Sequence, residues 1–372
     1  MINYFIGIIK RKFIFKTYLK KKYLILENLN SELLIKFLGV KDTEVVSLRS
    51  EINIFLVFKL LFSLKRFNQI NYYLESIKQI DPKKIITNID TNPNFYKLKR
   101  YFPNKTFISI QNGVRIDNTF KNEKNLKCDL IFCHGFKDID FYKKIISSSV
   151  IPLGSLKNND INNYYKKETN CISYISQFRE VDEKNSISHF LGKDFKGVTW
   201  GDYIKSEKKL ISTLYKICQK KNIKLYIVGA SFNSLKEKNW YVKLLNSSDI
   251  NFISRNRLTS SYDFLKKSKI TVCMHSTLGY EFLARGKKVI FFSRNINNLN
   301  KINKKIQFGY PFIKKTRGFF YTNQISEDQI IKLISNVEKI SKINWSTKIR
   351  NIKKQIMIFN YKNTILKKNL IS

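Results

Sequence analysis

Residues 270–293 read ITVCMHSTLGYEFLARGKKVIFFS and contain a complete strand, helix and strand. The apolar run at 270–274 has the length and β-branched content of a buried strand. Ser276 or Thr277 then caps a short helix, Gly286 closes it, and a second apolar run begins at 289. This order predicts one βαβ unit of a parallel sheet.

The same alternation continues on both sides of these residues. Apolar runs that indicate further strands lie at residues 23–26, 44–48, 84–90, 107–110, 130–133, 171–176 and 224–228, and one begins at 251. Between them, segments such as 31–38, 52–64, 68–79 and 207–221 have helical character. We therefore expect an α/β protein with two Rossmann-like, doubly wound parallel-sheet domains that face a cleft.

The best candidate for a linker is the polar run that follows IPLGS at residues 151–155. We expect one domain at residues 1–153, a linker at 154–170 and a second domain at 171–326. Ser326 and Gln329 form a capping box that opens a long helix, so residues 327–372 are expected to be helical.

The charge balance is extreme, with 69 Lys and Arg against 28 Asp and Glu, a net charge of +41. One interpretation is a polyanionic partner such as nucleic acid, an anionic membrane or an acidic glycan. The other is compositional bias, because the chain is rich in Lys, Ile, Asn, Phe and Tyr, whose codons are A/T-rich. The lysines are spread along the chain, which favours bias for most of the excess.

The five cysteines form no CxxC pair and are odd in number, which indicates buried thiols in a reducing compartment. We expect a cytoplasmic protein. The longest apolar stretch, residues 52–64, is too short to span a membrane. Residues 1–16, MINYFIGIIKRKFIFK, either lie peripherally on an anionic membrane face or form the first strand and turn of a domain.

The start of the helix after residue 274 suits a phosphate. Its free N–H groups and partial positive charge favour an anion. Glu281 lies one turn beyond Thr277 on the same face, where a carboxylate can accept hydrogen bonds from a ribose or sugar diol. For the cap alone, the simpler alternative is an ordinary capped helix with a solvent-facing glutamate.

Three segments carry a resemblance to a known family: HSTLGYEFLARGKKVIFFS at 275–293, FYKLKRYFPNKTFISIQNGVR at 95–115 and FFYTNQISEDQI at 319–330. They resemble GT-B glycosyltransferases of the bacterial surface carbohydrate biosynthesis family, with CDP-glycerol glycerophosphotransferases as more distant relatives. The resemblance covers roughly residues 80 to 340 with the order of elements intact.

The resemblance implies roles for the domains and for four residues. His275, Ser276 and Thr277 would face the donor phosphates and Glu281 the ribose. The second domain would bind the nucleotide donor and the first the acceptor. The helices at 327–372 would pack back toward the first domain, as they do in GT-B relatives.

Gln111 and Asn112 follow the strand at 107–110. In related transferases a histidine that can act as the base often precedes the glycine here. Asn112 stands in that place and cannot take a proton at neutral pH. Gln111 and Asn112 either hydrogen-bond the acceptor or donor, or belong to a plain turn with Gly113 at positive φ.

Asp90 follows the strand that begins at residue 84 and is our leading candidate for the general base that deprotonates an acceptor hydroxyl. The alternative is an N-cap for the helix that starts at Pro93, a role that Asn92 fills equally well. His134, at another strand end, is the rival candidate for the base. The alternative interpretation of His134 is a loop histidine with only a capping role.

Arg179 follows the strand at 171–176 and is expected to neutralise the departing donor pyrophosphate, with Arg255 and Arg257 as competitors. Each of them alone is more often a surface arginine. The DID motif at 138–140 lies in an expected helix, so we predict no metal site.

These patterns favour a metal-independent transferase of surface polysaccharide or lipopolysaccharide biosynthesis. It would use a nucleotide-sugar or CDP-polyol donor, a glycan or lipid-linked acceptor and no cofactor. Two alternatives stay open: a basic nucleic-acid-binding protein without catalysis, and a GT-B scaffold that binds a nucleotide sugar without turnover. The first lacks any recognisable nucleic-acid-binding module, so no specific nucleic acid is expected as a partner.

Overall fold

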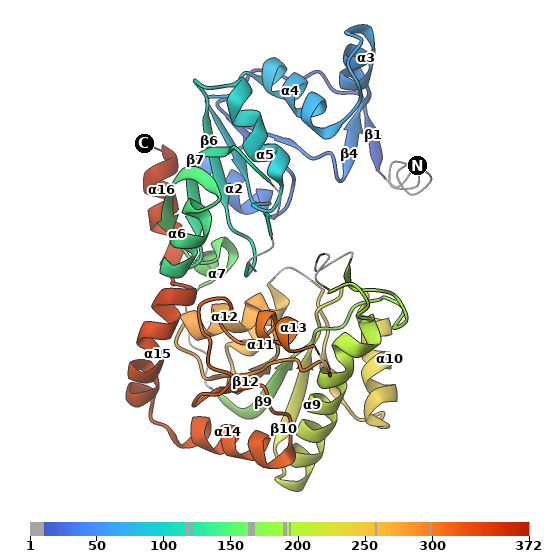
Figure 1. Cartoon of the computed structure of the whole chain (residues 1–372), viewed down its shortest axis with the longest axis vertical. Helices are drawn as coiled ribbons and strands as arrows, with labels where there is room; N and C mark the ends of the chain where they lie inside the picture. Colours follow the sequence, from blue (N-terminus) through green and yellow to red (C-terminus); the bar gives the residue numbers. More distant parts are fainter. Residues whose placement is uncertain are drawn as a thin grey trace. The chain divides into compact units, whose positions relative to one another are not determined.

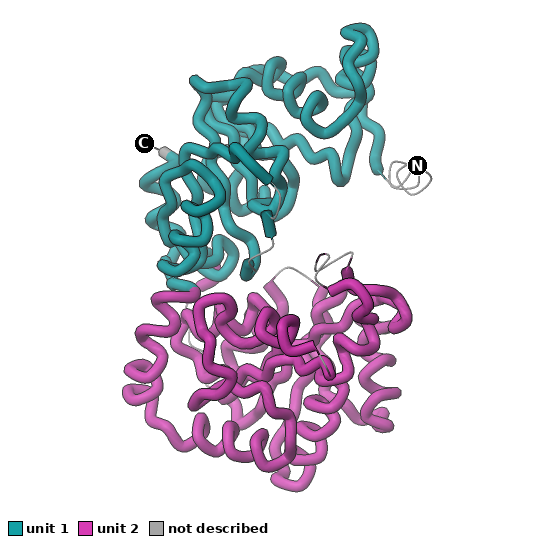
Figure 2. The backbone as a smooth tube through the Cα atoms, in the orientation of Figure 1, with its two compact units in different colours: residues 1–160, 357–372 teal, residues 161–356 magenta. Residues whose placement is uncertain are grey.

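A computed structural model of the chain describes residues 11–115, 119–120, 123–162, 168–188, 192, 195–256, 259–297 and 299–371. The chain divides into two compact units, shown in Figure 2. Unit 1 is Met1–Asp160 with Met357–Ser372, and unit 2 is Ile161–Ile356.

Unit 1 is built on a six-stranded sheet in the order β3-β2-β5-β6-β7-β8, with every pair parallel. Its strands are β2 (Tyr23–Leu26), β3 (Thr43–Val46), β5 (Lys84–Thr87), β6 (Thr106–Ile110), β7 (Leu126–Cys133) and β8 (Ile146–Pro152). Its helices are α2 (Ser31–Leu38), α3 (Ile54–Phe62), α4 (Gln69–Ile80), α5 (Pro93–Leu98), η1 (Lys99–Tyr101), α6 (Phe136–Lys143), α7 (Leu156–Asp160), η3 (Tyr361–Asn363) and α16 (Thr364–Ile371).

Both faces of this sheet are buried. Alternate residues of the same strands enter different apolar clusters: Ile85 packs with side chains of α4 and α5, whereas Ile86 packs with α2 and α16. This is the pattern that period-2 strands produce when helices cover both faces of a parallel sheet. The continuous apolar runs in the sequence follow from it.

Unit 2 repeats the architecture in the order β11-β10-β9-β12-β13-β14, again with every pair parallel. Its strands are β9 (Thr169–Ile175), β10 (Lys224–Val228), β11 (Asn251–Ile253), β12 (Ser268–Cys273), β13 (Val289–Phe292) and β14 (Tyr321–Thr322). Its helices are α9 (Trp200–Lys220), α10 (Ser234–Leu245), α11 (Ser260–Leu265), α12 (Thr277–Ala284), α13 (Asn300–Lys305), α14 (Glu327–Lys339) and α15 (Lys342–Ile356) (Figure 1).

The strand order of unit 2 is the Rossmann order: successive strands are added on one side of β9 up to β11 and then on its other side from β12 onward. Two separate parallel sheets confirm the predicted fold class.

The sequence interpretation differs from the structure at residues 52–64. The segment begins as a strand, β4 (Glu51–Asn53), which pairs in parallel with β1 (Lys12–Ile14) to form a small separate sheet. The helix α3 starts only at Ile54, because the Asn53 side chain accepts a hydrogen bond from the Phe55 N–H at 3.1 Å and caps it.

A second difference concerns the C-terminal helices, which we expected to return to the first domain from Glu327. β14 adds a sixth strand to the sheet of unit 2, and α14 packs on α9, β12 and β13 as its helix. α15 contacts α12, where the Trp345 indole N–H donates to the Gly286 carbonyl at 3.1 Å. Only the residues from Met357 onward belong to unit 1.

This C-terminal tail is attached to unit 1 by buried asparagines. The Asn159 amide donates to the Leu153 carbonyl at 2.8 Å and to the Asn363 side chain at 3.0 Å, and its oxygen accepts from the Asn360 N–H at 2.9 Å. The Asn363 amide donates to the Leu156 carbonyl at 2.9 Å. Asn159 and Asn363 are fully buried, so these bonds are shielded from water.

We predict that Asn159→Ala lowers the free energy of unfolding by about 2 to 3 kcal/mol, because it leaves several buried polar groups without a partner. Limited trypsin digestion should then cut the tail at Lys362 or Lys367 faster than in the parent chain. Asn369→Ala is the control, because its amide bonds only the Ile365 carbonyl of its own helix. Equal cleavage rates for parent and Asn159→Ala would contradict the proposed anchoring.

Candidate functional site

In unit 2, three neighbouring strands end side by side at one edge of the sheet. β9, β12 and β13 are adjacent and parallel, with Tyr174 opposite Val272 and Cys273 opposite Phe291. The loops that follow them therefore start together, at the point where the direction of winding reverses. Ligands of open α/β sheets bind at this position.

Helix α12 begins at this edge. Ser276 is its N-cap in an extended conformation, and the serine hydroxyl makes no capping hydrogen bond. Gly279 in the first turn is required by packing, because a Cβ there would overlap the Cys273 sulfur. Gly286 has φ +81° and ends the helix, as predicted. The helix thus presents its N-terminus, with Ser276 and Thr277, at the carboxyl edge of β12.

His275 and Glu281 are less open than the sequence suggested. Burial, with a smaller contribution from the positive charge of Arg294, lowers the pKa of His275 to about 4, so the imidazole is neutral at pH 7. Glu281 is 5% exposed and accepts a hydrogen bond from the Tyr262 hydroxyl of α11. The simple alternative of a solvent-facing glutamate is therefore wrong.

A buried carboxylate, Glu207 of α9, organises the same edge. Its Oε1 accepts hydrogen bonds from the Tyr174 hydroxyl at 2.8 Å, the Gln177 N–H at 3.0 Å and the Tyr241 hydroxyl at 3.2 Å. Its Oε2 lies 3.4 Å from Arg294 Nη2. Burial raises the pKa of Glu207, and the charge of Arg294 opposes that rise. Glu207 thereby joins β9, α10 and the end of β13.

Arg294, which the sequence analysis missed, follows β13 and is 1% exposed. Its Nε donates to the Tyr203 carbonyl at 3.1 Å and its guanidinium lies 4.1 Å from the Tyr203 ring centroid. Nη1 is buried without a hydrogen-bond partner. The signal that could have found it is its place directly after a buried strand, the rule that selected Arg179.

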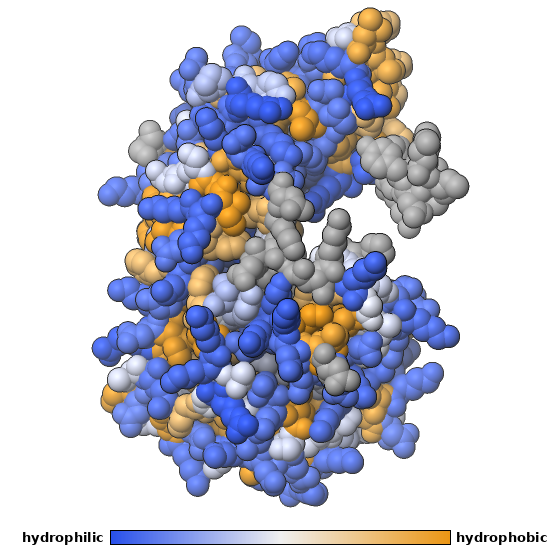
Figure 3. Space-filling view, in the orientation of Figure 1, coloured by the Kyte–Doolittle hydropathy of each residue, from blue (hydrophilic) through white to orange (hydrophobic). Residues whose placement is uncertain are grey.

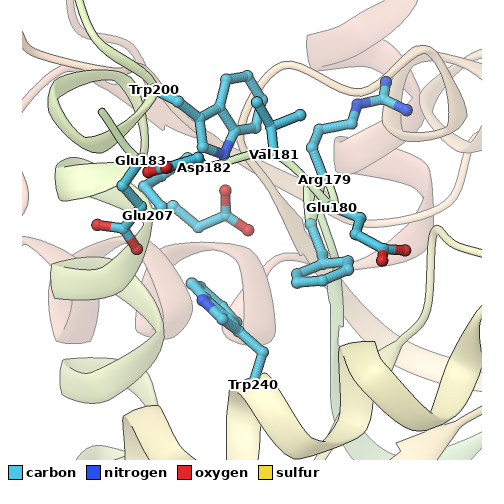
Figure 4. Close-up of a pocket in the computed structure, with 10 residues that line it drawn as sticks. Arg179, Glu180, Val181, Asp182, Glu183, Trp200, Glu207 and Trp240 are labelled. Carbon is cyan, nitrogen blue, oxygen red and sulfur yellow. The ribbon is translucent and has the colours of Figure 1, made fainter. Parts of the chain in front are cut away.

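A cavity of about 320 Å³ opens beside Glu207. Trp200 of α9 and Trp240 of α10 enter it from different helices, and Arg179 and Asp182 come from the loop after β9 (Figure 4). Flat indole faces and carboxylates together suit a sugar or a base with hydroxyl or amino donors. Arg179 is exposed and lines this cavity.

The competing arginines are placed differently. Arg255 donates to the Ala230 carbonyl at 2.7 Å and lies over the Phe232 ring at 4.4 Å. Arg257 lies outside the described residues. A second cavity of about 550 Å³, on the other side of α9, is lined by Lys205, Lys209 and the loops after β13 and β14. Ser276, Thr277 and Glu281 line neither of these two cavities.

In unit 1 the predicted residues also meet at the carboxyl edge of the sheet. Asp90, after β5, is fully buried and forms an ion pair with Arg115, whose Nε donates to Oδ2 at 2.5 Å. The Tyr142 hydroxyl donates to Oδ2 at 2.6 Å and the Asn112 N–H to Oδ1 at 3.1 Å. Burial favours a higher pKa for Asp90, but Arg115 and these donors outweigh it and hold the pKa below its usual value.

These contacts suit an anchor better than a base. A base needs a free lone pair and a pKa near the working pH, and the Asp90 carboxylate has neither. The alternative capping role falls to Asn92, whose side chain accepts from the Asn94 N–H at 3.1 Å. The Asn112 amide donates to the Asn88 carbonyl at 2.8 Å, so Asn112 also helps to hold the loop.

Gln111 and His134 are buried next to this ion pair. The Gln111 side-chain oxygen accepts a hydrogen bond from the backbone N–H of His134 at 2.7 Å. The Gln111 amide group donates to the Gly113 carbonyl at 2.9 Å. Burial lowers the pKa of His134 to about 3, and its Nε2 has no hydrogen-bond partner. Asn88 Oδ1 is likewise buried without a partner. Burial raises the pKa of the nearby Asp138 to about 7.

Within the ranges given above, no group of three or more His, Cys, Asp or Glu side chains is arranged to hold a metal ion. Nor does any described helix have the length and apolar character needed to cross a bilayer.

For the Asp90–Arg115 pair, we predict that Asp90→Asn lowers the free energy of unfolding of unit 1 by about 3 to 5 kcal/mol, because it leaves a buried guanidinium without its counter-charge. Tyr142→Phe, which removes one donor, should cost about 1 kcal/mol. All three tryptophans lie in unit 2, so circular dichroism reports this loss whereas tryptophan fluorescence stays as in the parent. If Asp90 is instead a base without an anchoring role, Asp90→Asn will keep the parent's stability.

For the Glu207–Arg294 pair, Arg294→Met should destabilise unit 2, because Glu207 loses its counter-charge. The pKa of Glu207 is already raised and should rise further, so the folded state gains from protonation and the deficit should shrink as pH falls. Urea unfolding of the parent and of Arg294→Met, followed by tryptophan fluorescence at pH 8 and pH 5, measures this loss of unfolding free energy. In the background Glu207→Gln, the effect of Arg294→Met should no longer depend on pH, and a persisting dependence would assign it to another group.

Three similarities to solved structures accompany this geometry. The S. aureus MnaA–UDP co-structure has a TM-score of 0.54 at 12% identity, over 95% of both chains. The wall teichoic acid polymerase TagF has a TM-score of 0.53 at 13% identity, over 94% of this chain and 89% of that one. A UDP-N-acetylglucosamine 2-epimerase has a TM-score of 0.52 at 12% identity, over 95% of both chains. At such identities the likeness establishes the fold, which is GT-B.

No curated protein matches the chain. A family model described as an O-antigen biosynthesis protein matches residues 108–371, more than half of the sequence. This match confirms the resemblance to surface-carbohydrate proteins that the sequence predicted. The matched region contains Asn112, His134, Glu207, Arg294 and the whole of α12, whereas Asp90 lies before it. The chain belongs to the O-antigen biosynthesis protein family.

Proposed function

We propose that the chain transfers a sugar, or a polyol phosphate, from a nucleotide-activated donor to a glycan or lipid-linked acceptor of a surface polysaccharide. Membership of the O-antigen biosynthesis family supports a role in the synthesis of a surface polysaccharide. The GT-B fold, shared with a protein solved in complex with UDP, supports the nucleotide-linked donor. The donor belongs to unit 2 and the acceptor to unit 1 in this proposal.

The observation that carries the proposal is the N-terminus of α12 at the switch point between β9 and β12. Because the Ser276 hydroxyl makes no capping bond, it does not occupy the N–H groups of the first turn, and a diphosphate would find donors there. His275, neutral at pH 7, can add one N–H donor. Arg294 supplies a buried positive charge near His275, and Arg179 a second cation from the loop after β9.

Glu281 would recognise the hydroxyls of the ribose or sugar. Its carboxylate accepts the Tyr262 hydroxyl, which orients the group, and a carboxylate has acceptor sites for several donors. A carboxylate repels phosphate, so a diol is the donor-side group that suits it. Fixed cations such as Arg179 and Arg294 would offset the charge of the leaving diphosphate without a metal.

For the acceptor side, the catalytic role of His134 stays a prediction, whereas Asp90, whose carboxylate already accepts four donors, is proposed as an anchor of the loop. Asp138 is a further candidate base, because its pKa of about 7 is the one in this cluster that matches proton transfer near neutral pH. Gln111 and Asn112 would support the loop that surrounds it. A scaffold without turnover would keep the donor contacts and lack the deprotonation of an acceptor hydroxyl.

Nucleotide binding tests the donor site. We expect Glu281→Ala and Thr277→Val each to weaken binding of the best nucleoside diphosphate or nucleotide sugar, by roughly ten- to a hundredfold for Glu281→Ala, because a charge-assisted hydrogen bond contributes about 1.5 to 3 kcal/mol. Isothermal calorimetry over a panel of UDP, CDP, GDP and their sugar or polyol conjugates measures this. Thr213→Val, the same isosteric change in the middle of α9, should bind as the parent does.

If both variants bind every nucleotide as tightly as the parent, the donor site lies elsewhere. Products of the parent with its best donor then separate the remaining functions. Transfer to a glycan or lipid-linked acceptor supports the proposal, a change of configuration in the donor sugar without transfer indicates an epimerase, and binding without turnover indicates a scaffold.

A further inference from the structure

Unit 1 exposes an unusual number of large apolar side chains in one region. They are Phe13 and Phe15 at β1, Phe55, Phe58, Leu61 and Phe62 on α3, and Leu64 just after it. Phe15 is 70% exposed, Phe62 87% and Leu64 97%. We call these seven residues the β1–α3 apolar surface. In Figure 3, hydrophobic residues gather on the region that Figure 1 labels α3.

The surface is continuous. β1 pairs with β4, which leads directly into α3, and the Phe15 and Phe55 rings meet edge to face with centroids 5.8 Å apart. Phe13 lies two residues before Phe15, on the same face of an extended strand. Phe55, Phe58 and Phe62 follow one another at i, i+3 and i+7, so they share one face of the helix.

Helix α3 is packed against the rest of unit 1 despite these exposed side chains. Leu56 and Leu60 are fully buried, and α3 packs on α4. The helix therefore has two apolar faces: one packed inward and one directed outward. A helix apolar all round is normally covered on all sides, and contiguous exposed apolar surface in a soluble unit marks an interaction site.

The charge around the surface identifies the partner. Residues 11–22 and 54–66 contain nine Lys and Arg and no Asp or Glu, while the neighbouring strand β4 adds Glu51 and Lys16 pairs with Glu44. Lys59 and Lys65 pair with the buried Glu75, whereas Lys20 and Arg66 are exposed. Phenylalanine and leucine side chains bordered by basic residues match a membrane interface, where the apolar groups enter the headgroup region and the cations meet anionic lipid.

We propose that the β1–α3 apolar surface docks unit 1 on an anionic lipid bilayer, with α3 lying along the interface. A nucleic acid would not cover seven apolar side chains, and α3 is far too short to cross the bilayer. The sequence analysis considered membrane contact for residues 1–16, of which 1–10 lie outside the described residues. The structure instead points to α3, whose second apolar face shows only after Leu56 and Leu60 are buried.

The test is co-sedimentation of the full chain with vesicles. The parent should bind phosphatidylglycerol-containing vesicles more tightly than pure phosphatidylcholine vesicles, and added salt should weaken the binding. Phe58→Ser/Phe62→Ser/Leu64→Ser should lower the affinity for the anionic vesicles at least about tenfold, because three large apolar side chains no longer enter the interface. Lys20→Gln/Arg66→Gln should lower it for anionic vesicles only.

The matched control is Leu235→Ser/Ile343→Ser, which removes two exposed apolar side chains from unit 2, where they are 71% and 79% exposed. It should bind vesicles as the parent does, and every variant should keep the parent's circular dichroism, since all of these residues are exposed. Binding that the triple variant retains in full would overturn the proposal. So would a lipid-free dimer of the parent that the triple variant abolishes, because a second copy of the chain would then cover the surface.

Discussion

Parallel strand pairing is the constraint on which both units depend. Every pair in the two six-stranded sheets is parallel, so all strands of a sheet deliver their following residues to the same edge. Residues far apart in the chain, such as Gln177, His275 and Arg294, thereby start neighbouring loops. The helices that parallel connections require cover both sheet faces and leave this edge as the open place for polar groups.

Each unit holds its edge together with a buried carboxylate and guanidinium, but the two pairs differ. Asp90 receives Arg115 on both oxygens together with two further donors, and its pKa is lowered. Glu207 meets Arg294 through one longer contact of 3.4 Å, so burial prevails and its pKa is raised. In the first pair, both oxygens of Asp90 already accept hydrogen bonds from groups of unit 1. The second leaves Nη1 of Arg294 without a partner at the edge where a phosphate donor is proposed to bind.

The high positive charge acquires a more specific meaning in this structure. Most of it is spread over the surface and is consistent with compositional bias. Around α3 it coincides with exposed phenylalanine and leucine side chains, a feature that charge alone does not explain. Docking on lipid through this surface would hold the chain near the lipid-linked acceptor that we propose for it.

The sequence by itself determined the two parallel sheets, the strand–helix–strand unit around α12 and the positions where that helix starts and ends, because the apolar period, Gly286 and the Ser276–Thr277 pair are local signals. It located Asp90, Gln111, Asn112 and His134 at strand ends for the same reason. Only the tertiary structure decided that Asp90 is saturated by Arg115 and Tyr142, that Glu207 of α9 pairs with Arg294 after β13, and that α14 and α15 stay with unit 2. These outcomes depend on which side chains come into contact although they are far apart in the sequence, and on how strongly burial desolvates them. Neither quantity is contained in local periodicity.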